Sequence, residues 1–360
     1  MMIKKILTKD YENVSLSCRY DPVAIKPLLA ELDARYETVN GLPVVPGAYG
    51  FMEEVLNRCV YSNIAIEEEN LGEEEALSLL KILQESYHKP VREKTLGNMR
   101  IVYNLIDSII PSSEPFEISE EFIKRLHTHI TFDVRREGNI PGCYRTKPAD
   151  FKHFEPPKSN IPELMRGLTS WFNSPEIKEL HPVLRAAAAH YHISMIHPFG
   201  DGNGRTARGV EGAILKKAGY RYLCRLMPIY YLENRKEYFH SFIMAERSGG
   251  FDMTPFLSFV LEGANRSLRM MYDFLLAGLR KLALNDYWEY LKSEGKIDSE
   301  EYSFITGLLS SVCTTGRADD FCLITLSESR RKTAEKLSGK GLLKIDENGH
   351  VCLNTELPKP

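Results

Sequence analysis

The chain has 360 residues, of which 43% are hydrophobic and 26% are charged, and its net charge is −3 with a pI near 6.4. This length favours two or three globular domains. The nearly balanced charge excludes an overall basic field that would draw the protein to nucleic acid.

The sequence shows no signal for a membrane or for secretion. No run reaches the roughly 18 apolar residues of a membrane helix, and the first residues lack the long apolar stretch of a signal peptide. Seven cysteines are scattered without a CxxC pair, which argues against a disulfide framework and a zinc ribbon. We therefore expect a cytoplasmic protein with no membrane partner.

Hydrophobic periodicity predicts a mainly α-helical protein. Residues 21–35 have a helix-forming composition but contain prolines, so a broken helical arm is expected there. Residues 50–62 carry apolar side chains at helical spacing, which predicts an amphipathic helix. Further helices are predicted over residues 73–89, 98–110 and 119–130, the last of which opens with a serine and acidic residues.

The middle of the chain changes character at residues 137–152, where glycines, an asparagine and a proline mark turns. The stretch after Gly142 is expected to form a short β-hairpin. Two helices follow over residues 162–173 and 181–197. The second helix is predicted to have one apolar face, made of Leu184, Ala188, Tyr191 and Met195.

This second helix should stop before Pro198, because proline disfavours helical geometry in the residue that precedes it. A new helix is predicted from Asn203. Residues 197–208 therefore form a tight loop from one helix into the N-terminus of the next.

The composition shifts again beyond residue 270. A helix, a basic helix and a hairpin with its turn at Asn348 and Gly349 follow in order, which is typical of a winged helix. We therefore divide the chain into an N-terminal helical region, a helical core and a C-terminal winged-helix-like module, at residues 1–100, 101–270 and 271–360.

The loop between the two central helices reads HPFGDGNGRTAR. A helix N-terminus preceded by glycines favours anions, because its first amides lack helical partners and the helix dipole attracts negative charge. Gly202, Asn203 and Gly204 are placed for this role. This stretch therefore predicts a phosphate site.

The charged residues of the same loop fit a polyphosphate. Arg205 and Arg208 lie within one helical turn, so their forked donors reach the same group of phosphates. Asp201 would repel a phosphate unless a cation such as Mg²⁺ lay between them. A neutral imidazole at His197 can take a proton from an attacking hydroxyl.

The better-known nucleotide motifs do not match. The glycines follow a GxGxG pattern without the GxGxxG spacing of a Rossmann turn, and no strand is predicted before them. The Gly-Lys pair of a P-loop is missing here as well.

The loop resembles the signature of the Fic family, HxFx[DE]GNGRxxR. Every fixed position is filled, by His197, Phe199, Asp201, Gly202, Asn203, Gly204, Arg205 and Arg208. The resemblance extends over roughly residues 100–265 and includes a segment at 141–173 that is similar to the family's flap and the helix after it. It implies a Fic-type helical core with a short β-hairpin flap.

Family members typically transfer AMP from ATP to a Ser, Thr or Tyr hydroxyl of a protein and release pyrophosphate. The resemblance thus implies ATP as substrate, Mg²⁺ as cofactor and a protein target, with self-modification expected. His197 would be the general base and Asp201 the Mg²⁺ ligand. Arg205 would contact the β-phosphate and Arg208 the γ-phosphate. The implied ATP-binding stretch is Gly202, Asn203, Gly204, Arg205, Thr206, Ala207 and Arg208.

The resemblance also implies how the target and the base are held. The flap, at roughly residues 142–152, would align an extended target segment as an added strand. Its expected contact residues are Gly142, Tyr144, Arg145 and Thr146. Phe199 is expected to be an apolar anchor of the loop. Tyr230 or Tyr231 would flank the adenine, and the alternative is that both are core aromatics.

Many relatives carry an inhibitory helix with the pattern [ST]xxxE[GN], whose glutamate pairs with the last arginine of the signature. The resemblance implies that Glu67 is this residue and Arg208 its partner. The pattern is imperfect, because Asn63 stands in place of Ser or Thr and Glu68 in place of Gly or Asn. An acidic helix end exposed to solvent is the alternative. A glutamate here also leaves AMP removal open as a second activity.

Several other histidines carry weaker signals. His190 and His192 lie two residues apart and thus on different helix faces, so packing is expected ahead of zinc binding. His127 and His129 have the same spacing, and no chemical role is predicted for either. Residues 330–337 are basic but accompanied by glutamates, which favours a structural or partner-docking wing over a DNA reader.

Three functions stay open on the sequence. We favour a protein adenylyltransferase inhibited by Glu67. The second is a Fic fold that removes AMP or performs another nucleotidyl or phosphoryl transfer. The third is a DNA-binding regulator whose core senses nucleotide, and His197 argues against it because a sensor needs no base. A homodimer also stays open.

Overall fold

A computed structural model describes residues 4–6, 14–68, 71–82, 91–149, 156–157, 160–247, 252–311, 322–325, 328–345 and 350–354. The chain divides into two compact units. The first unit contains residues 1–36 and 51–268, and the second contains residues 37–50 and 269–360.

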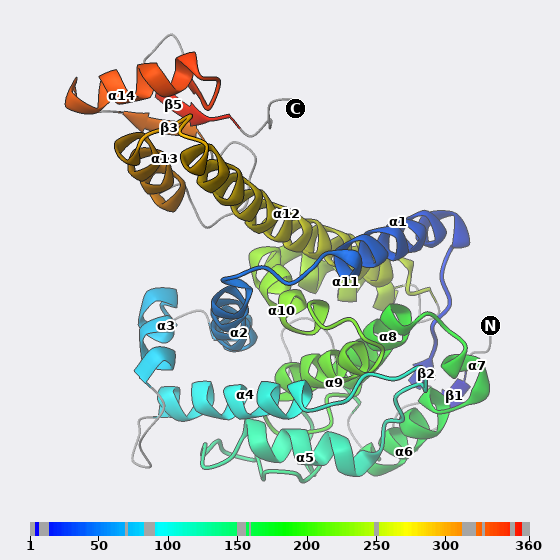
Figure 1. Ribbon diagram of the computed structural model, residues 1–360. Helices are drawn as coiled ribbons and strands as arrows, with labels where there is room; N and C mark the ends of the chain where they lie inside the picture. Colours follow the sequence, from blue (N-terminus) through cyan, green and yellow to red (C-terminus); the bar gives the residue numbers. More distant parts are fainter. Residues whose placement is uncertain are drawn as a thin grey trace. The chain divides into compact units, whose positions relative to one another are not determined.

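In its described residues the first unit consists of helices and one antiparallel strand pair, in line with the mainly helical protein that the periodicity predicted (Figure 1). The pair is formed by β1 (Lys4–Ile6) and β2 (Val14–Leu16). The early helices are α1 (Pro22–Gly41), α2 (Ala48–Ala65), α3 (Glu73–Ile82), α4 (Val91–Asp107), α5 (Glu120–Ile130), α6 (Ile161–Phe172) and α7 (Pro175–Lys178). The later helices are α8 (Pro182–Ile196), α9 (Asn203–Lys217), α10 (Leu223–Glu233), α11 (Arg235–Arg247) and α12 (Thr254–Ser293), the last of which continues into the second unit.

The prolines near the start of α1 do not break it, contrary to the sequence prediction. The helix runs without interruption through Pro27. Pro22 occupies its first position, where the amide has no helical acceptor to lose. Pro27 removes a single backbone hydrogen bond, which a helix of 20 residues tolerates.

Helix α8 is the centre of the first unit. It packs along α9 and against α6, and α9 in turn contacts α10 on one side and α4 and α5 on another (Figure 1). Residues 183–194 are therefore buried on every face of the helix, and not only on the face that Leu184, Ala188 and Tyr191 share. Four consecutive alanines leave room for close neighbours all round.

The turn from α8 into α9 lies where the sequence predicted it. Helix α8 ends at Ile196, His197 adopts a left-handed conformation, and α9 begins at Asn203. The predicted start of α5 is also confirmed, because the Ser119 hydroxyl accepts a hydrogen bond of 3.0 Å from the amide of Phe122.

The expected β-hairpin after Gly142 is not present in residues 142–149, which form turns and bends. Gly142 has a φ of +75°, and Arg145 donates its amide to the carbonyl of Pro198 rather than to a neighbouring strand. Residues 150–152 of the predicted flap lie outside the described residues.

The second unit contains the C-terminal part of α12, then α13 (Ser299–Ser311), β3 (Cys322–Thr325), α14 (Glu328–Gly339), β4 (Leu343–Ile345) and β5 (His350–Leu353). The strands form an antiparallel sheet in the order β3-β5-β4. Trp288, Ile305 and Leu337 lie in a buried apolar cluster that joins α12, α13, α14 and the sheet. The predicted turn at Asn348 and Gly349 lies outside the described residues.

Among the residues with described structure, no helix combines the length and the apolar character needed to cross a membrane.

Candidate active site

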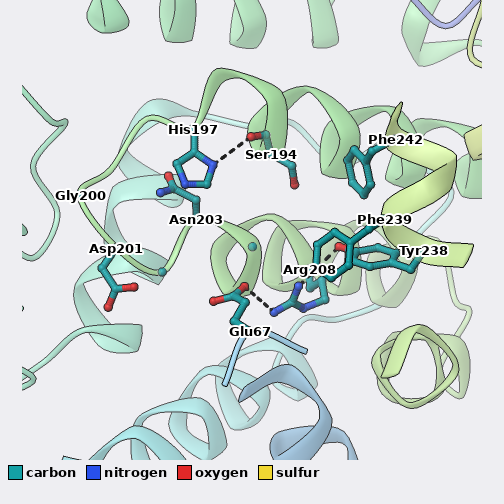
Figure 2. Close-up of a pocket in the computed structure, with 12 residues that line it drawn as sticks. Glu67, Ser194, His197, Gly200, Asp201, Asn203, Arg208, Tyr238, Phe239 and Phe242 are labelled. Atoms are coloured by element: carbon teal, nitrogen blue, oxygen red, sulfur yellow. Dashed lines mark hydrogen bonds and ion pairs between the residues drawn. The ribbon is translucent and has the colours of Figure 1, made fainter. Parts of the chain in front are cut away.

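A cavity of about 250 Å³ opens at the N-terminus of α9. One wall is polar and consists of His197, the loop at 200–204, Arg208 and Glu67. The opposite wall is aromatic and comes from α11, with Tyr238, Phe239 and Phe242 (Figure 2). The loop that the sequence singled out therefore lies on a cavity.

His197 ends α8 with φ 52° and ψ 59°, in the left-handed region. Its amide donates to the carbonyl of Ile193 at 3.0 Å, and its ring Nδ1 lies 3.2 Å from the carbonyl oxygen of Ser194. Because a carbonyl only accepts, Nδ1 carries the hydrogen and Nε2 keeps the lone pair. This is the tautomer that a general base needs.

Burial lowers the pKa of His197 below its ordinary value, and the positive charge of Arg145 lowers it further. Glu67 and Asp201 act in the opposite direction but do not outweigh burial. The imidazole is therefore neutral at pH 7 and able to accept a proton.

The N-terminus of α9 has the geometry of an anion site. Gly202 is its N-cap, with a φ of +74°, and the first amides of the helix have no acceptor within their own helix. The Asn203 side chain does not face the cavity as a ligand, because it bonds the Phe199 amide at 2.8 Å and the Phe199 carbonyl at 2.9 Å. Asn203 therefore fixes the loop with its side chain and offers only its backbone to an anion.

Glu67 lies directly against this anion site. A Cβ atom at Gly204 would collide with Glu67 Oε1, so only glycine allows the carboxylate to approach so closely. Oε1 accepts a hydrogen bond of 3.0 Å from Arg208 Nη2 (Figure 2). Oε2 lies 3.4 Å from Arg205 Nε. Glu67 thus occupies the position of an anion on both arginines.

Arg208 is almost completely buried and is also held by α2. Its Nε donates to Asn63 Oδ1 at 2.9 Å, and its Nη2 donates to the Asn63 carbonyl at 2.7 Å. On the other side its Nη1 lies 3.5 Å from the hydroxyl oxygen of Tyr238. Burial acts to lower the pKa of Arg208, but Glu67 and Tyr238 together raise it above its ordinary value.

Two more arginines hold the segment that carries Glu67. Arg136 Nη2 lies 3.1 Å from Glu68 Oε1, and Arg235 Nε donates to the carbonyl of Ile66 at 2.7 Å. The segment after α2 is therefore partly exposed but held by ion pairs and hydrogen bonds. The carboxylates of Glu67 and Glu68 point at different arginines.

Asp201 offers one carboxylate oxygen for a cation. Its Oδ1 accepts from Arg205 Nη2 at 3.0 Å, whereas its buried Oδ2 has no hydrogen-bond donor in the part of the chain that the structure describes. Arg136 Nε lies 3.8 Å from this Oδ2. Burial acts to raise the pKa of Asp201, but Arg205 and the Gly202 amide lower it below the ordinary value, so the group is ionised.

No cluster of three or more His, Cys, Asp or Glu side chains suited to a metal occurs among the described residues. Mg²⁺ differs from zinc in this respect, because one or two carboxylates suffice when phosphates and water supply the other oxygens. The unshared Oδ2 of Asp201 fits that requirement.

The predicted flap residues have different environments. Thr146 is exposed, while the Tyr144 hydroxyl donates to Glu120 Oε2 at 2.8 Å and the Gly142 amide donates to His127 Nδ1 at 2.9 Å. Arg145 is buried and bonds backbone carbonyls, including that of His197 at 2.7 Å. The Arg145 side chain therefore turns inward, which flap composition does not show, and its role as a target contact stays a prediction from the sequence.

His127 has a role that the sequence did not predict. Its ring stacks on Phe199 with centroids 3.8 Å apart, and Nε2 lies 3.0 Å from the Asp201 carbonyl. Since Nδ1 accepts from Gly142, the ring is neutral, and burial lowers its pKa to about 4. His127 joins the flap to the loop, and Phe199 is fully buried as an anchor.

Four residues that the resemblance associated with ATP lie behind the cavity. Tyr231 is fully buried and donates to Glu211 Oε1 at 2.7 Å, and Tyr230 packs on Phe259, so the core alternative holds for both. Thr206 donates to the Gly202 carbonyl at 2.8 Å, and Ala207 is fully buried. None of these four side chains lines the cavity in the described structure.

The aromatic wall of the cavity is a feature that the sequence did not predict. Phe239 and Phe242 lie three residues apart on α11 and border the cavity. The signal was the aromatic-rich stretch EYFHSF after the loop. Such spacing is equally typical of a helix packed in a core, so it did not single these residues out.

His190 and His192 are both buried with protein partners. His190 Nδ1 lies 3.0 Å from Glu211 Oε2 and its Nε2 lies 2.8 Å from the Tyr238 hydroxyl. His192 Nε2 lies 2.7 Å from the Ser17 carbonyl. Packing and hydrogen bonding account for both side chains.

The comparisons with known proteins all show similarity to Fic proteins. Residues 117–215 match the Fic/DOC family. The chain is 28% identical over 223 residues to protein adenylyltransferase fic-1 of Caenorhabditis elegans, a match that covers 61% of this chain and 41% of that protein. It is 36% identical over 116 residues to protein adenylyltransferase Fic of Drosophila erecta, covering 32% and 22% of the two proteins. The chain thus spans less than half the length of these curated relatives.

Solved structures show the same fold. A crystal structure of a Fic family protein from Desulfovibrio desulfuricans has a TM-score of 0.56 at 17% identity, over 95% of this chain and 99% of that one. Fic-1 from Caenorhabditis elegans has a TM-score of 0.58 at 24% identity, over 69% and 72% of the two chains.

Proposed function

We propose that residues 117–215, which match the Fic/DOC family, form a Fic domain, and that the protein transfers AMP from ATP to a hydroxyl side chain of a target protein. The observation that carries the proposal is the cavity itself. A neutral histidine, an ionised aspartate, a helix N-terminus and Arg208 meet around one space, opposite an aromatic wall. Arg205 does not line this space but pairs with Asp201 and Glu67, which do.

The proposed chemistry assigns one step to each group. Nε2 of His197 takes the proton of the target hydroxyl while the hydroxyl oxygen forms a bond to the α-phosphorus of ATP. The bond from the α-phosphorus to the bridging oxygen breaks, and pyrophosphate leaves. The amides at the start of α9 would stabilise the charge that grows on the phosphoryl oxygens.

The remaining groups would bind and orient the nucleotide. Arg205 and Arg208 would hold the β- and γ-phosphates once Glu67 has moved away. Asp201 would hold Mg²⁺ through Oδ2, and the ion would neutralise charge on the phosphates. Phe239 and Phe242 would form the apolar side of the adenine-binding site, the role that the resemblance implied for Tyr230 or Tyr231.

We further propose that Glu67 inhibits the transfer. Its carboxylate accepts a hydrogen bond from Arg208 and forms an ion pair with Arg205, and it lies against Gly204 at the start of α9. A triphosphate that uses both arginines has to displace it. Asn63 supports this inhibited arrangement, because it holds Arg208 towards α2 through two hydrogen bonds.

The direct test incubates the Glu67→Gly variant with Mg²⁺ and α-labelled ATP, alone and with added cell protein, and reads the modified mass. Transfer predicts a mass increase equal to AMP on protein. The same variant with His197→Ala is the control and should give no labelled protein. Failure of both proteins to label any substrate would contradict the proposed activity.

Removal of AMP is the second candidate, because a carboxylate and a histidine border the same cavity. Glu67 would then activate water against the bond between AMP and the target. Release of AMP from a pre-labelled target by the wild type, but not by Glu67→Gly, would favour this reaction.

For the second unit we propose a winged-helix-like module with a structural or docking role. The order of α13, β3, α14 and the β4–β5 pair supports the architecture. Arg331 on α14 is exposed but pairs with Glu335 at 3.4 Å, which weakens a phosphate-binding face. A gel-shift series over salt concentration tests the alternative, and salt-dependent DNA binding would overturn the docking role.

Self-modification, a homodimer, a cytoplasmic location and the domain limits at residues 100 and 270 remain predictions from the sequence.

A further inference from the structure

Arg145 has a buried guanidinium that is bonded entirely to backbone carbonyls. Nε donates to the His197 carbonyl at 2.7 Å, Nη1 donates to the Lys147 carbonyl at 2.9 Å, and Nη2 donates to the Pro157 carbonyl at 2.5 Å. A further contact of 3.4 Å joins Nη2 to the Ile196 carbonyl. The planar fork of arginine suits such a set of acceptors, whereas the single ammonium of lysine cannot reach them all.

Two of these carbonyls belong to the end of α8, directly at the base. His197 has φ 52°, a left-handed conformation that is strained for a residue with a side chain. Such a conformation persists only when its surroundings hold it. Arg145 donates hydrogen bonds to the carbonyls of His197 and of the preceding Ile196. The guanidinium therefore fixes the backbone that carries the imidazole.

The backbone around Arg145 strengthens the connection. The Arg145 amide donates to the Pro198 carbonyl at 2.9 Å, and Asn139 Oδ1 accepts from the Asp201 amide at 3.1 Å. Gly200 lies so close to the Gly138 carbonyl that a Cβ atom there would collide with it. The segment at 138–145 therefore packs on the loop at 197–201 through its backbone.

We propose that Arg145 is a positioning residue for His197. Its guanidinium holds His197 in its strained backbone conformation and connects the start of the flap to the loop at 197–208. Arg145 would thus fix the position of a target bound to the flap relative to the imidazole of His197. The activity part of this inference rests on the proposed AMP transfer, whereas the geometric part does not.

Charge gives the proposal a second readout. Arg145 has no carboxylate partner in the described structure, so its positive charge acts on His197 directly. Glu67 and Asp201 are the acidic groups that face the same imidazole. Removal of the guanidinium should therefore raise the pKa of His197, because the positive charge of Arg145 then no longer counteracts the negative charges of Glu67 and Asp201.

The test measures the tautomer and pKa of His197 by NMR in the full-length protein with ¹⁵N-labelled histidine, assigned with His197→Gln. The proteins are wild type, Arg145→Ala, Arg145→Lys and Arg185→Ala. Arg185 is the matched control, because it is also buried, donates to the Phe116 carbonyl at 3.0 Å and lies on α8, the helix that His197 caps. It precedes His197 by about 18 Å of helix.

We expect the Nδ1–H tautomer in the wild type and in Arg185→Ala. In Arg145→Ala the preference for this tautomer should weaken, the pKa should rise, and added guanidinium ion should reverse both changes where equal sodium chloride does not. A wild-type tautomer and pKa in a folded Arg145→Ala protein would overturn the proposal, whatever reaction the protein performs.

Arg145→Lys keeps the proposal testable if the alanine variant does not fold. In the Glu67→Gly background it should lower kcat for AMP transfer about 10- to 100-fold, as expected for a misplaced base. KM for ATP should stay constant, since Arg145 makes no contact with the α9 anion site. A folded Arg145→Lys variant with unchanged kcat would overturn the positioning role, and an inactive Glu67→Gly parent would count against the AMP transfer alone.

Discussion

Replacement of Glu67 by glycine tests the inhibitory contact most directly. The variant removes the carboxylate that bonds Arg208 Nη2 at 3.0 Å and faces Arg205 Nε at 3.4 Å. Both guanidinium groups are buried, whereas the Glu67 side chain is 26% exposed. The variant therefore leaves two buried cations that a triphosphate can neutralise.

The size of the effect follows from these contacts. A hydrogen bond between charged groups contributes about 1.5–3 kcal/mol. With the longer contact to Arg205 added, we take the hold of Glu67 as about 2–4 kcal/mol. Wild type has to give up this free energy when phosphates bind the arginines, and the variant does not. ATP should therefore bind the variant about 30- to 1,000-fold more tightly in the productive arrangement.

Calorimetric titration with Mg²⁺–ATP and the initial rate of AMP transfer measure this change. Glu68→Gly is the matched control, because it makes the same backbone change one residue away and removes a half-exposed ion pair with Arg136. It should raise ATP affinity and transfer far less than Glu67→Gly. Equal affinity and rate in wild type and Glu67→Gly would refute the inhibitory role.

Three further predictions concern individual groups. His197→Ala in the Glu67→Gly background should slow transfer by about 10²- to 10⁴-fold while ATP binding persists, and a parallel loss of ATP binding by calorimetry would contradict a role as base. Asp201→Asn keeps an acceptor for Arg205 but removes the charge, so the half-saturating Mg²⁺ concentration for transfer should rise at least about tenfold; an unchanged Mg²⁺ titration would remove Asp201 as ligand. Burial lowers the pKa of His127 from 6.5 to about 4, so the folded pKa lies below the unfolded one. Its contribution to stability is therefore complete above pH 6.5 and falls by about 3 kcal/mol as the pH drops to 4. Between pH 6.5 and 4 the melting temperature should fall less steeply with pH in His127→Gln than in wild type. An identical pH dependence in both proteins would contradict a lowered pKa of His127.

The sequence predicted the loop at 197–208 well because its chemistry is contiguous. A helix end, three glycines, a carboxylate and two arginines follow one another, so local geometry alone brings them together. The pairing of Glu67 with Arg208 spans 141 positions, and only the resemblance to a family suggested it. The structure places the two groups in contact.

The residues that support the loop could not be predicted in the same way. His127, Asn139 and Arg145 reach it from segments far away in the chain, and each is a polar residue whose type is equally common on a surface. Arg145 showed the limit most clearly, because its position in a flap suggested an outward role. Whether a long side chain turns inward depends on tertiary packing that periodicity does not encode.

The aromatic residues show a different limit. Tyr231 and Phe239 both lie in helices after the loop, and both have helical neighbours that are apolar. Only the packing of α10 and α11 decides that Tyr231 is buried and that Phe239 borders the cavity. Helix α8 is similar, since its burial on every face follows from its central place and not from its own pattern.

The central claim is the transfer of AMP, and position-specific labelling tests it most directly. The Glu67→Gly variant is incubated with Mg²⁺ and ATP labelled either at the α- or at the γ-phosphate, and protein-bound label is counted. The account predicts label from the α-phosphate alone, with release of pyrophosphate and loss of the signal in the His197→Ala background. Protein-bound label from the γ-phosphate would instead show phosphoryl transfer and contradict the account.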